Sequence, residues 1–478
     1  MSSLRDNAPL LDAYLTYFES HNTPFTIPGH KQKASALDTD LGKVVDSDIP
    51  LYGGLDEMKV TNKTLPRAEK LAAKLWGADY ARFSTGGSTH SNQAIIFALG
   101  QPGDKVAVSR TAHRSVLSAL VLAGLEPIWM SPEIDSATGV PIGIGIAELE
   151  RALHHNPVAV LLTEPGYLGT LSDLPTLISA AHHKKIPVVL DAAWGGHFGF
   201  HDALPKHAMQ LGADALVTSV HKALPGYSAS ALLIARTEFL SADRMEQSFE
   251  STHTTSPAGA PLASIDGVRA LLQSRGAELI SSLLDNVARF KERVQGEFAL
   301  PIFLYPSDFP ARRFDPTKIV LRAEQLGASG IDIEKDLLAG GVRVEMADRD
   351  TIVFLATIAD SAADFDRLAD VLIPILKKRQ EQRRDSATAL SWSVVPQKAM
   401  SMRDAYFAHT EMVDAAQAIG RVSADLIAPY PPGVAVVAPG ETLTEEIVTG
   451  LQNSRAAGVR IAYASDATLA RFRVVNRS

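Results

Sequence analysis

The most constraining feature of this sequence is a regular alternation of short apolar runs and amphipathic segments between about residues 70 and 235. The apolar runs are rich in β-branched residues and read KVAVS, PIWM, VAVLLTE, PVVLD, ALVTSV and ALLIA. This alternation is typical of βαβ units, in which a mainly parallel sheet carries helices on both faces. In such sheets ligands bind beyond the carboxyl ends of the strands, so polar residues at those ends are the first candidates for a site.

The chain is long enough for several domains, and changes in its composition predict four parts. Its 478 residues correspond to roughly two to four domains of ordinary size. The parts are an N-terminal helical arm, a large ligand-binding domain, a linker helix with a small α+β domain, and a C-terminal α+β domain, at residues 1–30, 31–270, 271–385 and 386–478. Within the last part, we expect a helix over residues 405–420 and a strand framed by Pro and Gly over residues 430–441.

The composition excludes several classes of function. The formal net charge is −8 and no lysine- or arginine-rich face is visible, so nucleic acid is not an expected partner. The first twenty residues predict an amphipathic helix, and no apolar run is long enough to span a bilayer, so we expect a cytoplasmic protein that does not bind membranes. The absence of cysteine excludes disulfides, thiolate metal sites and thiol nucleophiles. We expect no metal site, and the reactive groups must come from other side chains or from a cofactor.

The most informative segment is the strand at residues 215–220, which runs directly into His221 and Lys222, with Ser219 near its end. Ammonium groups are seldom buried without a partner, so a lysine at the end of a buried strand is unusual. Partial desolvation lowers the pKa of a lysine and makes the amine nucleophilic, as a Schiff base with an aldehyde cofactor requires. Taken alone, Lys222 is explained equally well as a side chain that reaches past the strand to solvent.

A second strand end carries Asp191, which closes the run PVVLD and is followed by Trp194. A carboxylate here can pair with the protonated ring nitrogen of pyridoxal 5′-phosphate (PLP) and keep the ring an electron sink. In isolation, an aspartate at this position is more often a loop cap or a turn residue. Together with Lys222, Asp191 favours a PLP site.

A glycine-rich turn at residues 83–92, FSTGGSTHSN, precedes the helical run AIIFALG. Backbone N–H groups and the helix dipole at such a helix start form an anion site, to which Gly87, Ser88 and Thr89 would contribute. The turn lacks the Gly-Lys-Ser/Thr sequence of a nucleotide-binding P-loop. We interpret it as a cofactor-phosphate site, and an ordinary capped helix is the alternative.

A further candidate is His113, which lies just beyond the strand KVAVS. An imidazole at this strand end could stack on the cofactor ring and orient the substrate. A structural histidine is the alternative, and the other three strand-end features favour the functional interpretation.

The combined motifs resemble those of the fold-type-I, PLP-dependent Orn/Lys/Arg decarboxylases. The matching segments, in chain order, are TIPGHKQK at 26–33, SVHKALPGYSASALL at 219–233, STHTTSPAGAPLAS at 251–264, VEMAD at 344–348 and YPPGVAVVAPGE at 430–441. The resemblance covers most of the chain. It implies an aspartate-aminotransferase-like large domain with a mainly parallel seven-stranded sheet, and two small α+β domains. Because the first motif begins near residue 27, we expect a short form without the family's N-terminal wing domain.

The resemblance also implies roles for individual residues. Lys222 would carry the cofactor as a Schiff base, Asp191 would pair with its ring nitrogen and His113 would stack on the ring. The remaining cofactor contacts would come from the glycine-rich turn and the two strand ends, namely Gly87, Ser88, Thr89, Trp194, Ser219 and His221.

The family resemblance further implies a homodimer with active sites at the subunit interface. The segment that contains Thr255 and Ser256 would reach the cofactor of the neighbouring subunit, although the two residues are equally well explained as a helix N-cap pair. Glu345 and Glu441 could meet the cationic end of a substrate, or simply cap turns.

The activity that the resemblance implies is decarboxylation of a basic amino acid, with arginine as the first expectation, lysine next and ornithine last. Either Lys222 or His221 would return a proton to Cα. Two alternatives remain open at this point, because a fold does not dictate a reaction. One is another PLP reaction, such as transamination or elimination, and the other is a non-catalytic, decarboxylase-like regulatory protein.

Overall fold

The computed structural model describes residues 3–20, 28, 30–49, 63–311, 313–384, 394–430 and 434–476. The chain divides into two compact units, and each is built from separated stretches. The first unit comprises Met1–Ala98, Val189–Asp202 and Lys206–Ile280, and the second comprises Leu99–Val188, Ala203–Pro205 and Ser281–Ser478. The four-part division predicted from the sequence stays a prediction.

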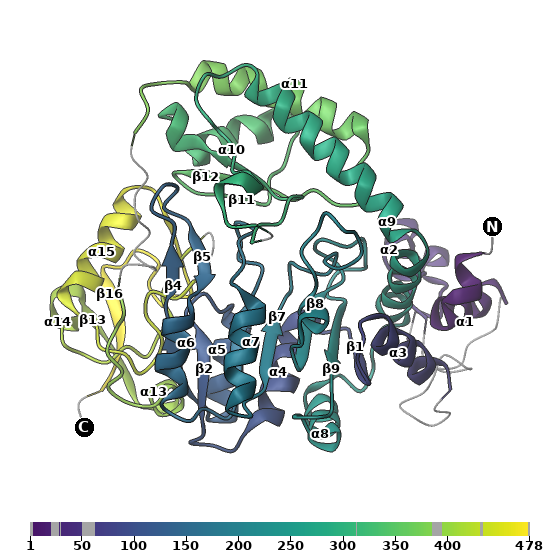
Figure 1. Ribbon diagram of the computed structural model, residues 1–478, viewed down its shortest axis with the longest axis horizontal. Coiled ribbons are helices and arrows are strands. Elements are labelled where there is room, and N and C mark those ends of the chain that lie inside the picture. The colour runs from purple at the N-terminus through teal and green to yellow at the C-terminus, as the bar shows by residue number, and fades with distance from the viewer. Residues whose placement is uncertain are drawn as a thin grey trace. The chain divides into compact units, whose positions relative to one another are not determined.

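A mixed seven-stranded sheet has the strand order β1-β9-β8-β7-β6-β2-β3 (Figure 1). Its strands are β1 (Tyr80–Ser84), β2 (Lys105–Ser109), β3 (Glu126–Met130), β6 (Val160–Thr163), β7 (Val188–Asp191), β8 (Ala215–Ser219) and β9 (Ala231–Ala235). β2 pairs in parallel with β3 and β6, β7 pairs in parallel with β8, and β9 runs antiparallel to β1 and β8. The six apolar runs expected to be strands all belong to this sheet, and the α/β fold class is confirmed.

Strand register in the first unit brings polar strand ends to one edge. β7, β8 and β9 are buried throughout, as expected for strands covered on both faces. Ser84 and Ser219 both pair with Ala231, which places the carboxyl ends of β1 and β8 at the same edge. Asp191 pairs with Val217 in the parallel β7–β8 ladder, so it also lies near this edge.

The helices of the first unit begin with the N-terminal arm, where the expected amphipathic helix is confirmed. The elements are η1 (Leu4–Asn7), α1 (Pro9–Glu19), η2 (Ala34–Ala36), α2 (Thr39–Val45), α3 (Thr64–Leu75), α4 (Gly87–Leu99), η3 (Ala208–Leu211) and α8 (Ala242–Thr252). The long helix α9 (Gly259–Gln295) begins in this unit and ends in the second. The arm is held by Asp266 of α9, whose Oδ2 accepts a 2.8 Å hydrogen bond from the N–H of Leu10.

The second unit contains the helices that follow β2, β5 and β6, and a small α+β core. The first group is α5 (Arg114–Ala123), α6 (Ile146–Leu153) and α7 (Leu174–His183), with the hairpin β4 (Pro132–Ile134) and β5 (Pro141–Ile144). The small core joins β10 (Ile319–Arg322), β11 (Met346–Ala347) and β12 (Thr351–Phe354) to α10 (Gly330–Ala339) and α11 (Ala362–Arg379), with η4 (Pro306–Asp308) and η5 (Ala323–Leu326). Apolar residues of the last part of α9 pack into this core. The charged run near residue 380 ends α11, as the sequence predicted.

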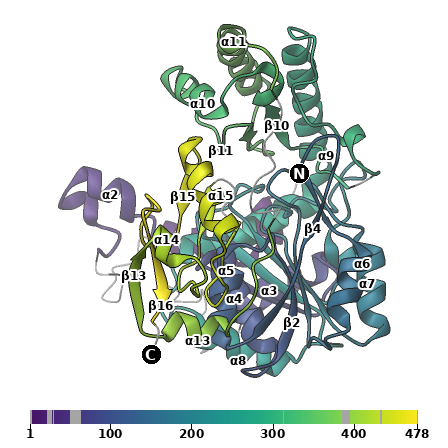
Figure 2. The ribbon, with the colours of Figure 1, turned by 90° about the vertical axis from the view of Figure 1, so that its left-hand side faces the viewer.

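The C-terminal part corrects two expectations. Its elements are α13 (Met402–Phe407), β13 (Thr410–Asp414), α14 (Ala415–Ala418), β14 (Ala428–Tyr430), α15 (Glu445–Ala456), β15 (Arg460–Ala462) and β16 (Arg471–Val475). The helix predicted over 405–420 was wrong, because β13 lies within it and pairs along its whole length with β16 (Figure 2). That pairing buries Val413, a non-local contact that overrides the local helical pattern.

The predicted strand over residues 430–441 was also wrong. Residues 431–433, like parts of the 26–33 motif, lie outside the described residues. Residues 434–441 contain only isolated bridges, in which Val437 pairs with Ile427 and Glu441 with Lys398. The segment turns instead of extending, since the N–H of Glu441 donates to the carbonyl of Ala438. Within the part of the chain that the structure describes, no helix is long and apolar enough to cross a membrane.

Candidate active site

The glycine-rich turn brings two serine hydroxyls together at the start of α4. Gly87 has a φ of +69°, a conformation that favours glycine, and its N–H donates to the carbonyl of Ala229 at 2.6 Å. The next residue, Ser88, places its Oγ 2.7 Å from the Oγ of Ser219 at the end of β8. Thr89 is exposed. Two hydroxyls therefore meet at the amino end of a thirteen-residue helix, where backbone N–H groups and the helix dipole favour a bound phosphate.

Asp191 is held as a fixed, buried acceptor. It is 5% exposed, and its Oδ2 accepts a 2.9 Å hydrogen bond from Nδ2 of Asn92 while its Oδ1 accepts from the N–H of Ala193 at 3.2 Å. Both donors orient the carboxylate. Asn92 was missed in the sequence, although it lies one helical turn after Ser88 and so shares a face of α4 with it.

Lys222 follows β8 and lies over an aromatic ring. Its side chain is half-buried, and Nζ is 4.7 Å from the centre of the Trp194 ring, which comes from the segment after β7. The neighbouring His221 has Nδ1 2.9 Å from the carbonyl oxygen of Ser230. A carbonyl only accepts, so Nδ1 is the donor in this hydrogen bond. Two strand-end segments of the first unit thus bring Lys222 and Trp194 together.

His113 and a carboxyl group that the sequence reasoning missed belong to the second unit. His113 is the N-cap of α5, where its Nδ1 accepts from the N–H of Ser115 at 3.2 Å. Its stacking on a cofactor ring stays a prediction.

Glu164 directly follows β6, is 5% exposed, and accepts a hydrogen bond from the N–H of Ser172 at 2.9 Å. Burial raises the pKa of Glu164 to about 7. The strand-end rule that selected Asp191 would also have selected Glu164.

The remaining candidates lie in different surroundings. Thr255 and Ser256 are exposed between α8 and α9, and since α9 begins at Gly259 neither residue is its immediate N-cap. Glu345 is exposed. Glu441 is buried, and its carboxylate accepts two hydrogen bonds from the guanidinium of Arg110, at 2.6 and 2.8 Å. In the described contacts Glu441 therefore neutralises Arg110.

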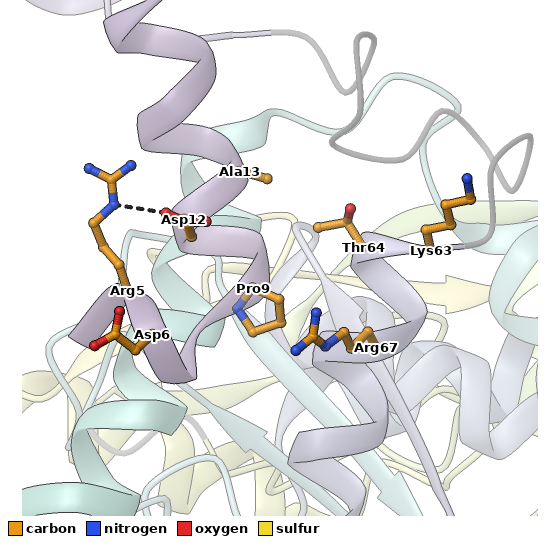
Figure 3. A pocket seen from close by; sticks show the side chains of 8 residues that line it. All are labelled: Arg5, Asp6, Pro9, Asp12, Ala13, Lys63, Thr64 and Arg67. Atoms are coloured by element: carbon orange, nitrogen blue, oxygen red, sulfur yellow. Dashed lines mark hydrogen bonds and ion pairs between the residues drawn. The ribbon is translucent and has the colours of Figure 1, made fainter. Parts of the chain in front are cut away.

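A separate pocket of about 440 Å³ lies in the first unit between α1 and α3 (Figure 3). Its lining residues are Arg5, Asp6, Pro9, Asp12, Ala13, Lys63, Thr64 and Arg67. Charges of both signs line it, and Arg5 is paired with Asp12 at 2.9 Å. None of the residues predicted to bind the cofactor is among them.

The residues of the first unit fit PLP. The cofactor needs an amine for its aldehyde, an acid for its ring nitrogen and an anion site for its phosphate. Lys222, Asp191 and the Ser88–Ser219 pair, which lie at strand ends on one edge of the sheet, would supply these three groups. Residues 8–364 match the major domain of the Orn/Lys/Arg decarboxylases, and residues 383–458 match their C-terminal domain.

The chain belongs to the Orn/Lys/Arg decarboxylase family. It is 33% identical to an arginine decarboxylase of Bacillus subtilis, over 98% of this chain and 97% of the relative. It is 32% identical to an arginine decarboxylase of Halalkalibacterium halodurans, over 99% of this chain and 98% of the relative. A constitutive lysine decarboxylase of Escherichia coli is 22% identical, over 93% of this chain and 76% of the relative.

Solved structures of this family share the fold. The lysine decarboxylase LdcF of Francisella novicida matches with a TM-score of 0.84 at 19% identity, covering 98% of this chain and 81% of that chain. The constitutive lysine decarboxylase of E. coli matches with a TM-score of 0.80 at 21% identity, covering 99% and 82%. The aspartate-aminotransferase-like, fold-type-I class expected from the sequence is confirmed. The Orn/Lys/Arg decarboxylase resemblance is also confirmed, and membership makes the chain a PLP-dependent decarboxylase of a basic amino acid.

Proposed function

We propose that this chain decarboxylates L-arginine to agmatine, with lysine as the next candidate substrate. The arginine decarboxylases it resembles are 31–33% identical over most of their length, whereas the lysine decarboxylases are 22–23% identical. The observation that carries the catalytic part of the proposal is the convergence of Lys222, Asp191 and the Ser88–Ser219 pair at one sheet edge in the first unit.

The first-unit residues divide into those that would hold the cofactor and those that would move a proton. Ser88, Ser219 and the amino end of α4 would hold the phosphate, and Trp194 would shield the amine of Lys222 from water. When bound, PLP supplies the electron sink that accepts the electron pair left as CO2 departs. Asp191 keeps the positive charge at the ring nitrogen that this sink requires, and Asn92 and Ala193 hold its carboxylate in place.

The proton that replaces the carboxylate at Cα would come from Nζ of Lys222, and His221 is the second candidate. The substrate must be held with its Cα–carboxylate bond perpendicular to the cofactor ring, since only that bond then overlaps the π system. His113 would fix this orientation by stacking on the ring, with Glu345 as a candidate for the cationic end of the substrate.

We also propose a cytoplasmic homodimer with its active sites at the interface, acting in polyamine formation. The family resemblance and the exposure of Thr255 and Ser256 between α8 and α9 support this assembly. In it, these two residues would reach the cofactor site of the neighbouring subunit.

The test is amine and CO2 analysis of the purified protein, supplied with PLP and with arginine, lysine or ornithine in turn. Agmatine with an equal amount of CO2 is expected from arginine. A keto acid without CO2 would show an aminotransferase, and cadaverine alone would move the substrate to lysine.

A cofactor-labelling experiment separates an enzyme from a non-catalytic relative. Borohydride reduction of the PLP-loaded protein should attach the cofactor to Lys222, as read by peptide mass spectrometry. The Lys222→Ala variant should remain colourless, whereas the exposed lysine variant Lys206→Ala should keep the yellow band. Absence of cofactor binding in the unmodified protein would favour a regulatory protein.

A further inference from the structure

Two histidines, the buried His90 of α4 and the half-buried His253 after α8, lie against the glycine-rich turn. His90 is 5% exposed, and the centroids of the two imidazole rings are 4.8 Å apart. Both rings pack on Phe249, at centroid distances of 4.5 and 5.1 Å. A Cβ added to Gly86 of the turn would lie 2.7 Å from the Cβ of His90, so the backbone of the turn passes directly over this side chain.

The hydrogen bonds of His90 have a fixed direction. Its Nε2 is 3.3 Å from the carbonyl oxygen of Phe249, which can only accept, so Nε2 carries the proton of the neutral ring. Nδ1 is then an acceptor, and the Oγ of Ser84 lies 2.8 Å from it. The Ser84 hydroxyl therefore donates to Nδ1 in preference to the carbonyl of Gly87 at 3.4 Å.

Once the Ser84 hydroxyl donates to His90, its oxygen is oriented to accept from the turn. The N–H of Gly86 donates to this Oγ at 3.1 Å. The chain of hydrogen bonds thus runs from the turn through Ser84 and His90 to the carbonyl of Phe249 on α8. The N–H of Thr85 also points at the imidazole of His253, at 3.5 Å from its Nε2.

The surroundings of His90 keep its ring neutral, and a neutral ring is required for Nδ1 to accept the hydrogen bond from Ser84. Burial, followed by the neighbouring His253, lowers the pKa of His90 to about 4, and the hydrogen bond to the carbonyl of Phe249 opposes this shift without cancelling it. A protonated ring would lose the Nδ1 acceptor and so reverse the bond to Ser84.

We propose that His90 is a positioning residue for the cofactor phosphate, acting through Ser84 on the backbone of the glycine-rich turn. It touches neither cofactor nor substrate, and it holds the turn at the geometry in which the amino end of α4 and Ser88 face the phosphate. This rests on the proposed function, since it assigns the phosphate of PLP to this turn.

The test compares the affinity of the apo-protein for PLP and for pyridoxal, which has the aldehyde and ring but no phosphate. His90→Phe keeps the ring volume and the contacts with Phe249 but removes both hydrogen bonds. It should weaken PLP binding about tenfold, the effect of roughly one hydrogen bond to an ordered group. Pyridoxal binding should be unchanged, because Lys222 and Asp191 are untouched.

Two further variants and one control keep the result interpretable. Ser84→Ala should weaken PLP binding to a similar extent, and His90→Asn, whose amide oxygen can accept from Ser84, should recover most of the affinity. His207→Phe removes another buried histidine of the first unit and should leave PLP binding unchanged. If His90→Phe does not fold, the Ser84→Ala variant, which lacks a single oxygen atom, carries the test.

The outcomes distinguish this inference from the proposed function. If the unmodified protein binds PLP and the variants of His90 and Ser84 bind it equally well, His90 is only a core residue and the inference is wrong. Equal losses for PLP and pyridoxal would also reject it, since they indicate general disturbance. If the unmodified protein does not bind PLP, the proposed function itself fails.

Discussion

The buried ion pair between Arg110 and Glu441 permits a quantitative prediction for the second unit. Both side chains are 3% exposed, and the carboxylate accepts two hydrogen bonds from the guanidinium. Arg110 also donates to the carbonyl of Val436 at 2.8 Å and lies 4.7 Å from the ring centre of Trp129. The pair joins the end of β2, three residues before His113, to the C-terminal part.

The perturbation is Glu441→Gln, which leaves the guanidinium buried with no opposing charge in this pair. Removing one partner of a buried pair costs about 3–5 kcal/mol of unfolding free energy. With an unfolding entropy of about 2 cal/mol/K per residue, a 478-residue chain that melts in one transition should lose about 3–5 °C in Tm. Thermal unfolding followed by circular dichroism, with kcat and KM for arginine measured at 25 °C, is the assay.

The double variant Arg110→Met, Glu441→Leu is the control. Replacing a buried pair by apolar residues of similar size often restores stability. Recovery should be partial here, because the N–H of Ala438 loses its acceptor, the Oε2 of Glu441, which lies 2.7 Å away. A Tm for Glu441→Gln within about 1 °C of the parent, together with a raised KM, would refute this reasoning and would support the alternative that Glu441 meets the cationic end of the substrate.

Three further predictions concern the first unit. Asn92→Ala removes the 2.9 Å donor to Asp191 and should weaken PLP binding about five- to tenfold in an absorbance titration, and unchanged affinity would contradict a supporting role. Asp266→Ala removes the acceptor of the Leu10 N–H, so limited proteolysis should cleave the N-terminal arm faster, and an unchanged cleavage rate would show that this hydrogen bond does not hold the arm. Burial lowers the pKa of His207 to about 4. As the pH falls from 6.5 to 4, the unfolded chain therefore takes up a proton on this histidine that the folded chain does not, and the free energy of unfolding should fall by up to about 3 kcal/mol. Urea unfolding should show a shallower decline for His207→Phe, and parallel declines would refute this assignment.

Much of the candidate site could be predicted because its residues follow strands whose apolar composition predicts that they are buried. Asp191 and Ser219 end fully buried strands, and Lys222 lies three residues beyond one of them. Hydrophobic periodicity, apolar runs and the position of a polar residue at a strand end are local properties, so they can be recognised in the sequence without knowledge of the fold. The residues that support the candidate site could not be predicted in this way. Asn92 and His90 lie in the same glycine-rich segment that was singled out, yet nothing local distinguishes the side chain that supports Asp191 from the one that supports Ser84.

The C-terminal part shows most clearly which features depend on contacts between residues far apart in the sequence. Residues 410–414 have a sequence compatible with a helix and become a strand because β16, some sixty residues later, offers a pairing edge. Likewise, Glu441 looks like a candidate ligand in the sequence, and only its contact with Arg110, 331 residues earlier, shows the charge that it neutralises.

The sequence by itself determined the α/β class and six of the seven strands of the sheet. It also singled out the lysine, the acid and the glycine-rich turn that we propose for the cofactor site, since each depends on the order of residues within a short segment. Tertiary structure alone decided which side chains support that site and which charges are already paired. Hydrogen bonds and ion pairs depend on distances of about 3 Å between groups far apart in the chain, and only the folded backbone sets those distances.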